Sequence, residues 1–508
     1  MGLLSWLVFL PLLGAVVLAL VPRANRAAVC GVALGVALAT FAVSLVVLGA
    51  FTVGEAGFQL VERGPWIPPL GVEYHVGIDG ISLLLVLLTT LLTPLVVLAA
   101  WGDVHRREKE FFAFLLLLET GMLGAFVALD LFLFYVFWEL MLVPMAFLIG
   151  VWGGRRRLYA AVKFVLFTMA GSLPMLVAIL YLAARVKASG GAPGFDYDQF
   201  LGLRLAPREQ LWLFAAFALA FAIKVPLFPL HTWLPDAHVE APTGGSVILA
   251  GVLLKMGTYG FLRFAMPLFP DAVQQASPLL VGLAVAGIIY GALVATVQPD
   301  LKKLVAYSSV SHLGFVMLGL FALDRTAVVG SVYQMLNHGL STGALFLLVG
   351  MLYERRHTRM IADFGGLWAQ VPVYAVCLLI AMLASAGLPG LNGFVGEFLI
   401  MLGAFKRWPW QTVLGSSGVV LGALYLLWMY QRVIFGPLVH DENRRLEDLS
   451  RRELAVIVPV LALCVVMGVY PTPFLRVMQP SVDKILARID RPVVHTAALA
   501  VRDGQGVR

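Results

Sequence analysis

The sequence has 508 residues, of which 60% are hydrophobic and only 13% charged, with a mean hydropathy of +0.91. A soluble domain carries about 25% charged residues, so this composition excludes a soluble globular protein and predicts an all-α protein that crosses a membrane many times. The net charge of +7 does not indicate a nucleic-acid partner, because basic residues in membrane proteins mainly hold loops on the cytoplasmic side.

A hydrocarbon core of about 30 Å is crossed by about 20 helical residues. By that measure the sequence predicts fourteen spans, which begin near residues 2, 28, 79, 111, 130, 158, 210, 244, 277, 302, 326, 373, 411 and 453. Basic residues concentrate in loops after odd-numbered spans, which predicts that both termini lie on the outer side of the membrane. Loops 52–78 and 186–209 are too short to fold alone, and residues 474–508 form a polar tail with one short surface helix.

The chain carries few residues that could hold a redox group or a nucleotide. Cys30, Cys377 and Cys464 lie far apart in apolar stretches, so the sequence predicts no iron–sulfur cluster, no zinc site and no disulfide framework. It contains neither a G-x-x-x-x-G-K-[ST] loop nor a dinucleotide fingerprint. We therefore expect no cofactor and no metal on this chain.

Seven ionisable residues fall near the middle depth of the predicted spans. They are Glu119, Glu139, Lys224, Lys255, His312, His338 and Glu397. Ionisable groups inside a membrane are rare and mark ion pathways, although a single histidine more often donates a hydrogen bond between helices. Lys163 and Arg263, near span ends, are interpreted as residues that reach toward the surface, and Asp130 as a turn residue.

Two of the predicted spans contain helix breakers close to these ionisable residues. Pro226 and Pro229 follow Lys224, and the segment Gly387–Gly390 precedes Glu397. Non-helical backbone at this depth is tolerated only where it lines protein or water. Broken helices 7 and 12, at corresponding positions, predict two inverted five-helix repeats. The predicted divisions are 1–110, the first three helices; 111–267, helices 4–8; 268–435, helices 9–13; and 436–508, the last helix and tail.

Seven motifs are long enough to be specific: "GIDGISLLLVLLTTLLTPL", "FYVFWELMLVPM", "IKVPLFPLHTWLPDAHVEAPT", "LLKMGTYG", "AYSSVSHLG", "LNHGLSTGALF" and "GLPGLNGFVGEF". Together they closely resemble the antiporter-like subunits of respiratory complex I. The resemblance covers nearly the whole chain and is strongest to the NuoM type, the bacterial counterpart of mitochondrial NADH dehydrogenase subunit 4. Relatives of the subunit-2, subunit-5 and Mrp types typically carry a lysine on the broken twelfth helix, where this chain has Glu397.

The resemblance implies a role for each ionisable residue. Glu139 and Lys224 would form the coupled ion pair of one half-channel, and Lys255 would be the central relay. His312 and His338 would carry the proton onward to Glu397 at the exit. Glu119 is an accessory candidate, identified by its depth alone.

The expected function is proton translocation in NADH:quinone oxidoreductase. The resemblance implies that flavin, iron–sulfur clusters and quinone are bound by partner subunits, and that neighbouring antiporter-like subunits are its partners. The alternatives are an Mrp-type Na⁺/H⁺ antiporter subunit, a membrane-bound hydrogenase subunit, and a structural subunit whose polar axis only holds helices together.

Overall fold

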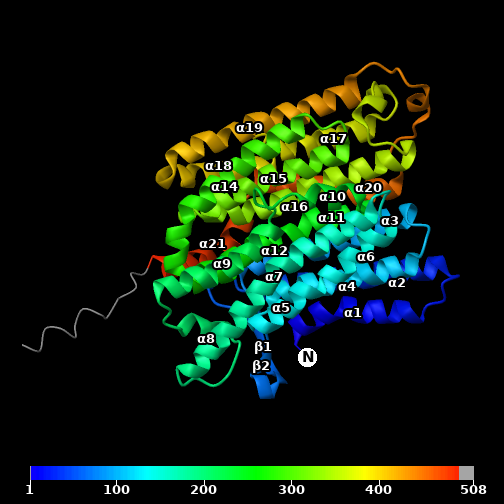
Figure 1. The fold of residues 1–508 in the computed structure, drawn as a ribbon. Helices are drawn as coiled ribbons and strands as arrows, with labels where there is room; N and C mark the ends of the chain where they lie inside the picture. Colours follow the sequence, from blue (N-terminus) through cyan, green and yellow to red (C-terminus); the bar gives the residue numbers. More distant parts are fainter. Residues whose placement is uncertain (1, 491–508) are drawn as a thin grey trace, which may run out of the picture.

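The computed structural model describes residues 2–490, in which long helices run side by side as one bundle (Figure 1). Its first part holds three long helices and a two-stranded hairpin. These elements are α1 (Leu3–Leu20), α2 (Arg26–Ala50), β1 (Gln59–Ile67), β2 (Val72–Ile78) and α3 (Gly80–Asp103). The three boundaries between the four predicted divisions, near residues 110, 268 and 436, lie at or close to the ends of helices.

The segment predicted as the first five-helix half contains ten α-helices, because several of its spans are interrupted. They are α4 (Glu108–Val127), α5 (Leu131–Leu140), α6 (Leu142–Trp152), α7 (Arg157–Ala188), α8 (Tyr197–Gly202), α9 (Pro207–Lys224), α10 (Trp233–Glu240), α11 (Thr243–Ile248), α12 (Leu254–Gly260) and α13 (Met266–Leu268). Two π-helical segments, Leu249–Leu253 and Phe261–Ala265, join α11, α12 and α13 into one buried run.

The segment predicted as the second half follows the same order with fewer interruptions. Its helices are α14 (Pro270–Thr296), α15 (Leu301–Leu320), α16 (Arg325–Arg356), α17 (Pro372–Ser385), α18 (Asn392–Arg407) and α19 (Pro409–Tyr430), with a π-helical end at Gln431–Phe435. The described chain ends with α20 (Arg451–Val469) and α21 (Thr472–Ile489).

Twelve helical runs in residues 2–490 are long and apolar enough to cross a membrane, compared with the fourteen spans that the sequence predicts. The difference lies in the two spans predicted to be broken. In one, α9 carries charged residues at both ends and stops at Lys224; in the other, α17 has only 14 residues before its interruption. The interruptions are therefore where the sequence places them.

Two runs form the interior of the bundle. The apolar windows of Thr243–Leu268 and of α16 are completely buried, whereas that of α2 is only 28% buried and that of α7 only 39%. Apolar side chains exposed on α2 and α7 therefore form the surface that faces lipid or neighbouring subunits. The buried runs carry Lys255 and His338.

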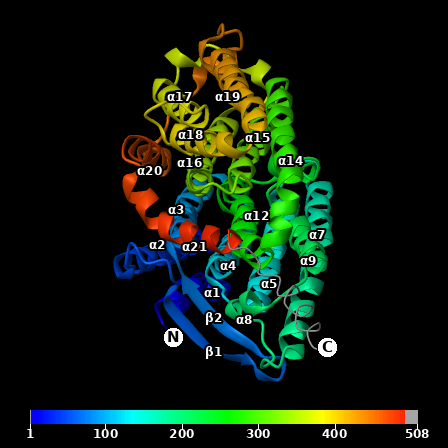
Figure 2. The same cartoon turned by 90° about the vertical axis from the view of Figure 1, so that its left-hand side faces the viewer.

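The hairpin was not predicted from the sequence, and the helix predicted in the tail is longer than expected. β1 and β2 pair antiparallel, and α21 is an 18-residue helix rather than a short surface helix in a polar tail. Both lie across the same end of the bundle (Figure 2), where the Gly80 amide donates to Ser481 Oγ at 3.2 Å. Residues 491–508 of the predicted tail lie outside the described residues.

Each predicted half contains one backbone bridge made of two hydrogen bonds, and the two bridges match. In the first half the Leu131 amide donates to the Phe195 carbonyl at 2.8 Å, and the Tyr197 amide donates to the Leu129 carbonyl at 2.9 Å. Asp130 sits inside this bridge and caps α5 through the Leu133 amide at 2.9 Å, so it is a turn residue as predicted.

The second half repeats the bridge with different residues. The Leu301 amide donates to the Arg359 carbonyl at 2.9 Å, and the Ile361 amide donates to the Pro299 carbonyl at 2.8 Å. Asp300 occupies the place of Asp130 and caps α15. The first bridge lies beside β2 and the second beside the opposite end of the bundle, as expected of inverted repeats.

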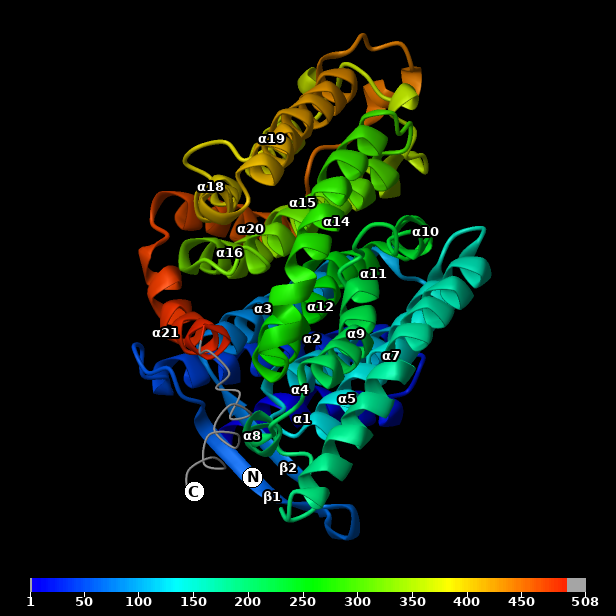
Figure 3. The same cartoon turned by 60° about the vertical axis from the view of Figure 1, so that its left-hand side comes forward.

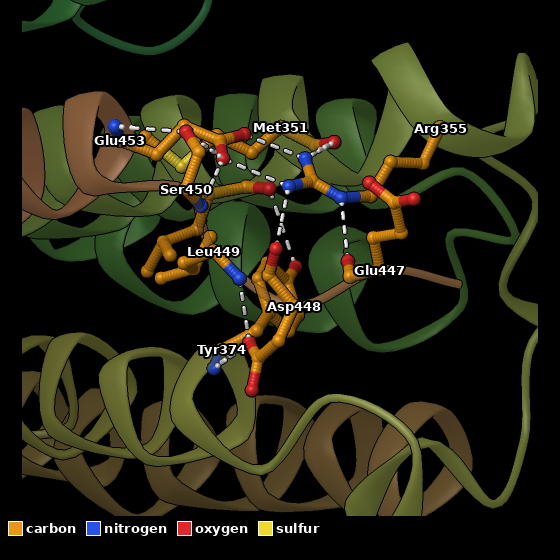
Figure 4. A network of polar contacts seen from close by, with 9 residues as sticks. Met351, Arg355, Tyr374, Glu447, Asp448, Leu449, Ser450 and Glu453 are labelled. Carbon is orange, nitrogen blue, oxygen red and sulfur yellow. Dashed lines mark hydrogen bonds and ion pairs between the residues drawn. The ribbon is translucent and has the colours of Figure 1, made fainter.

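A polar network links the C-terminal end of α16 to the starts of α17 and α20 (Figure 4). Arg355, near the end of α16, contacts both carboxylate oxygens of Glu453, at 2.6 and 2.8 Å, and the carbonyls of Glu447 and Asp448. The Asp448 carboxylate accepts from the Tyr374 amide at 2.9 Å at the start of α17. The Arg355 guanidinium thus joins α16 to α20, and Asp448 links this network to α17.

We predict that Arg355→Gln destabilises the protein, because the nearly buried Glu453 carboxylate loses its bidentate partner. Removing one member of a buried ion pair costs about 3 kcal/mol, measurable as a lowered thermal unfolding midpoint of the purified protein. Arg444→Gln is the matched control, since the Arg444 and Asp441 side chains are 60% and 93% exposed. Equal midpoints for the two variants would contradict the prediction.

Candidate functional site

The α9 helix ends at the lysine that the sequence identified. After Lys224 the chain leaves the helix, and the Leu227 amide turns back to the Ala222 carbonyl at 2.8 Å. The Trp233 indole donates to the Ile223 carbonyl at 2.9 Å, so one carbonyl freed by the break regains a partner. The break predicted from Pro226 is confirmed.

Lys224 and Glu139 face the same region but do not touch. Lys224 is fully buried, and its Nζ has no hydrogen-bond partner in the part of the chain that the structure describes. Glu139 lies on α5, and its Oε1 also lacks a partner within residues 2–490. The direct ion pair implied by the resemblance is therefore not formed in this arrangement.

The lysine is instead surrounded by aromatic rings. Its Nζ lies 5.2 Å from the centroid of the Trp138 ring on α5 and 5.6 Å from the centroid of the Phe164 ring on α7. Sequence reasoning gave Trp138 and Phe164 no role, because an aromatic residue in an apolar run carries no distinguishing signal.

Lys255 follows a π-helical segment and contacts the second half. The segment Leu249–Leu253 displaces the regular hydrogen-bond pattern, and the Lys255 ammonium donates to the carbonyl of Ala250 within it. The same Nζ lies 2.7 Å from His338 Nδ1 on α16. Packing of α9 against this run is close, since a Cβ on Gly257 would lie 2.6 Å from the Phe221 carbonyl.

The polar line continues through α15 to the second broken helix. The His338 and His312 rings lie 6.0 Å apart between centroids. His312 Nδ1 lies 2.9 Å from Glu397 Oε1, and His312 Nε2 lies 3.5 Å from the Tyr425 hydroxyl on α19. Figure 3 shows α18, which carries Glu397, beside α16 and α15. The four predicted residues Lys255, His338, His312 and Glu397 thus form one succession.

The two oxygens of Glu397 have different surroundings. Oε1 receives the His312 contact and a hydrogen bond from Gln334 Nε2 at 3.1 Å. Oε2 points toward the interruption between α17 and α18, where a Cβ on Gly387 would lie 3.2 Å from it. Gly387 has φ +76, a left-handed conformation that glycine adopts without strain. The break predicted at Gly387–Gly390 is confirmed.

A chain of amides holds the start of α18 against α16. Asn337 Nδ2 donates to Gln334 Oε1 at 3.0 Å and to the Asn392 carbonyl at 2.7 Å. This approach requires Gly396, because a Cβ there would lie 2.3 Å from Gln334 Oε1. Sequence reasoning missed Gln334 and Asn337, since amides on a wholly buried helix resemble ordinary interhelical contacts.

Glu119 stands apart from this line. It is fully buried on α4, and neither carboxylate oxygen has a hydrogen-bond partner in residues 2–490. Gly124 packs against Phe137 and Gly121 against Met141, so Glu119 and Glu139 lie within about one helical turn of the same depth. Their predicted match in depth holds, but the two carboxylates do not meet.

The interpretation of Arg263 as a residue that reaches the surface is wrong. Its side chain is buried, and its guanidinium contacts Asp79 at 2.5 Å, because the π-helical segment Phe261–Ala265 turns it toward the start of α3. The partner lies far away in the sequence, so no local pattern reveals the pair. Lys163 likewise binds Asp236 at 2.7 Å instead of extending freely.

His238 is a further buried residue that sequence reasoning passed over. It lies on α10, stacks on the Phe346 ring at 4.6 Å, and has no hydrogen-bond partner in the part of the chain that the structure describes. The residue that follows α10, Ala241, accepts a hydrogen bond from Lys302 at 2.5 Å, so α10 is attached to the start of α15.

Within residues 2–490, one group of side chains has the composition of a metal site. It comprises Glu73, His75 and Asp196 beside the hairpin, but Arg63 contacts Glu73 at 2.6 Å and Asp196 at 3.2 Å. Burial alone would raise the pKa of the Asp196 carboxyl, yet the hydrogen bond from His75 and the charge of Arg63 hold that pKa below its usual range. The group is an ion-pair network that stabilises the fold at neutral pH and loses this contribution as the pH falls through the lowered pKa.

The sequence is similar to those of known membrane proteins over nearly its whole length. Residues 128–422 match the family model "NADH:quinone oxidoreductase/Mrp antiporter, TM". The chain is 48% identical over 497 residues to NADH-quinone oxidoreductase subunit M of Rhodobacter capsulatus, covering 96% of each chain. It is 43% identical over 484 residues to NADH-ubiquinone oxidoreductase chain 4 of Marchantia polymorpha, covering 95% of this chain and 97% of the relative. The chain belongs to the antiporter-like complex I subunits of the subunit M type.

Solved structures agree with membership of the complex I subunit M family. A chain of respiratory complex I from Thermus thermophilus with bound NADH has 37% identity, a TM-score of 0.87, and coverage of 96% of this chain and 100% of that one. A chain of the Mrp complex from Dietzia sp. DQ12-45-1b has a TM-score of 0.82 at 19% identity, with coverage of 96% and 100%, and shows a shared fold alone.

For this subunit M relative we predict that Gly396→Ala disturbs Glu397, because the new methyl group would overlap the Gln334 and Asn337 side chains. Overpacking of this kind costs about 1–3 kcal/mol, and quinone-driven proton uptake in vesicles should fall. Gly35→Ala on α2 is the matched control, since nothing lies within 4 Å of its added Cβ. Unchanged proton uptake and thermal midpoint in Gly396→Ala would show that the amide chain tolerates the methyl group.

Proposed function

We propose that this chain translocates protons in the membrane arm of an NADH:quinone oxidoreductase, through its line of buried ionisable residues. The observation that carries the proposal is the succession Lys255–His338–His312–Glu397, which links a π-helical segment to a broken helix across the two halves. A line of titratable groups at this depth is expensive to bury without a use. The subunit M relatives support the same activity.

In this proposal Glu139 and Lys224 form the switch. When the lysine lies near the ionised Glu139, its charge is stabilised; when they separate, the ammonium is favoured less and its proton moves toward Lys255. Each 1.4 kcal/mol of changed interaction alters a proton equilibrium about tenfold. The observed separation of Glu139 and Lys224 corresponds to the open state of the switch.

From Lys255 the proton passes to His338, with which it is in hydrogen-bond contact. It then crosses to His312 through water between the two rings and reaches Glu397 Oε1. Transfer of one charge across the full membrane potential costs about 2.3 kcal/mol per 100 mV. Quinone reduction by partner subunits supplies this free energy.

The chain works as one part of a larger membrane enzyme. The chain is the translocase part of the enzyme and performs no redox chemistry; flavin, iron–sulfur clusters and quinone belong to partner subunits. Its neighbours are other antiporter-like membrane subunits, in a bacterial inner membrane with both termini on the periplasmic side. The exposed apolar faces of α2 and α7 and the alternation of loop charge support this placement.

We predict that Glu139→Gln and Lys224→Ala leave the complex assembled and reduce proton pumping by an order of magnitude or more. Each change removes one charge of the switch, so the remaining group no longer alternates between two states. Pumping and quinone reduction are measured in proteoliposomes containing the variant complexes. Near-normal pumping in both variants would exclude the switch, and sodium uptake in place of proton uptake would favour an Mrp-type antiporter.

Glu397 gives a second test. Glu397→Gln keeps the shape and the contacts with His312 and Gln334 but cannot release a proton, so pumping should fall severely. Glu397→Lys restores a titratable group and should pump more than Glu397→Gln at equal assembly. If Glu397→Gln pumps as well as the unmodified protein, the carboxylate is structural and the exit lies elsewhere.

We also predict that the purified chain binds no flavin, haem or iron–sulfur cluster. Cys30, Cys377 and Cys464 are separate and buried, which provides no ligand cluster. The measurement is visible absorption and electron paramagnetic resonance of the isolated subunit. A stoichiometric signal from either would overturn this part of the proposal.

A further inference from the structure

Lys224 presents a buried positive charge with no hydrogen-bond acceptor. Its side chain is fully buried at the end of α9, and its Nζ has no partner among the described residues. An ammonium removed from water needs a substitute for its hydration shell. Apart from Glu139 on α5, which faces the same region without touching Lys224, the charged groups on neighbouring segments have partners of their own. Lys163 contacts Asp236, Lys255 contacts His338, and Arg263 contacts Asp79.

The groups that face Lys224 Nζ are two π-systems from different helices. Its distances to the centroids of the Trp138 and Phe164 rings, 5.2 and 5.6 Å, fall within the limit of about 6 Å for a cation–π contact. Both rings are buried and held by other aromatic residues: Trp138 by Phe221 at 5.5 Å and Phe164 by Trp233 at 5.3 Å. The Trp138 Nε1 has no hydrogen-bond acceptor in residues 2–490, so packing rather than a hydrogen bond orients this indole.

We propose that Trp138 and Phe164 form a cation–π resting site that holds the Lys224 ammonium when it is separated from Glu139. The inference rests on the proposed proton-transfer function and adds two positioning residues to it. Trp138 and Glu139 are consecutive on α5, so one helix offers the lysine two alternative partners, a ring face and a carboxylate. A short movement exchanges them without leaving the charge uncompensated.

The resting site explains how the switch opens in a dry interior. Parting a buried ion pair with nothing to replace it leaves two unsatisfied charges. The ring quadrupoles attract the ammonium less strongly than the carboxylate does. Lys224 therefore stays protonated when the pair opens, and it then gives up its proton more readily than it would beside Glu139. An apolar residue at position 138 would fill the space but lack this attraction.

The first test replaces Trp138 with a series of fluorinated tryptophans in the assembled complex. Fluorine withdraws charge from the ring face and hardly alters its shape, so a role in packing alone leaves activity unchanged. Each added fluorine should move the alkaline limb of the pH profile of pumping to lower pH, by about one unit for the tetrafluorinated ring. The same series at Trp212, 71% exposed on α9, should move nothing.

The second test distinguishes the effect of an aromatic ring at position 138 from the effect of side-chain volume. Trp138→Phe retains a π face and should keep pumping within about twofold, whereas Trp138→Leu should reduce it several-fold at equal assembly. A pH profile that does not move along the fluorinated series overturns the resting site. If Lys224→Ala also pumps normally, the proposed function fails; if Lys224→Ala is inactive and the series is flat, only the resting site fails.

Discussion

A titratable side chain buried among apolar helices must find its partners inside the protein, because neither lipid nor solvent can supply them. This constraint accounts for much of the bundle. Beside three of the ionisable residues at depth, the backbone departs from a regular α-helix: α9 stops at Lys224, a π-helical segment precedes Lys255, and α17 gives way to α18 before Glu397. These departures free carbonyls and create space close to the charges.

Much of the site was predictable because charge in an apolar run is conspicuous in a sequence. Glu139, Lys224 and Lys255 could be identified by that contrast alone, and proline and glycine marked the breaks beside them. The order of the histidines was not predictable, since the contact between Lys255 and His338 joins positions 83 residues apart. Only the resemblance to complex I subunits suggested a sequence of transfer.

Other features could not be predicted, for distinct physical reasons. Arg263 was misjudged because its partner Asp79 is remote in the chain and is brought to it by a π-helical segment. The hairpin and α21 have alternating or amphipathic patterns that carry little signal in a hydropathy scan tuned to spans of twenty residues. The role of Trp138 could not be predicted because it depends on the face of the indole ring, whereas in the sequence Trp138 is one apolar residue among many.

The matching backbone bridges have a consequence for movement. In the first half the bridge between Leu131 and Phe195 fastens the end near the hairpin, while the short helix α10 lies at the other end. In the second half the bridge between Leu301 and Arg359 fastens the opposite end, and α18 runs away from it. Each half is thus fastened by its own backbone bridge, and the two bridges lie at opposite ends of the bundle. A movement that pivots about one bridge displaces most strongly the end that the other bridge holds, so the two halves cannot swing about a shared hinge while the long buried helix α16 lies between them.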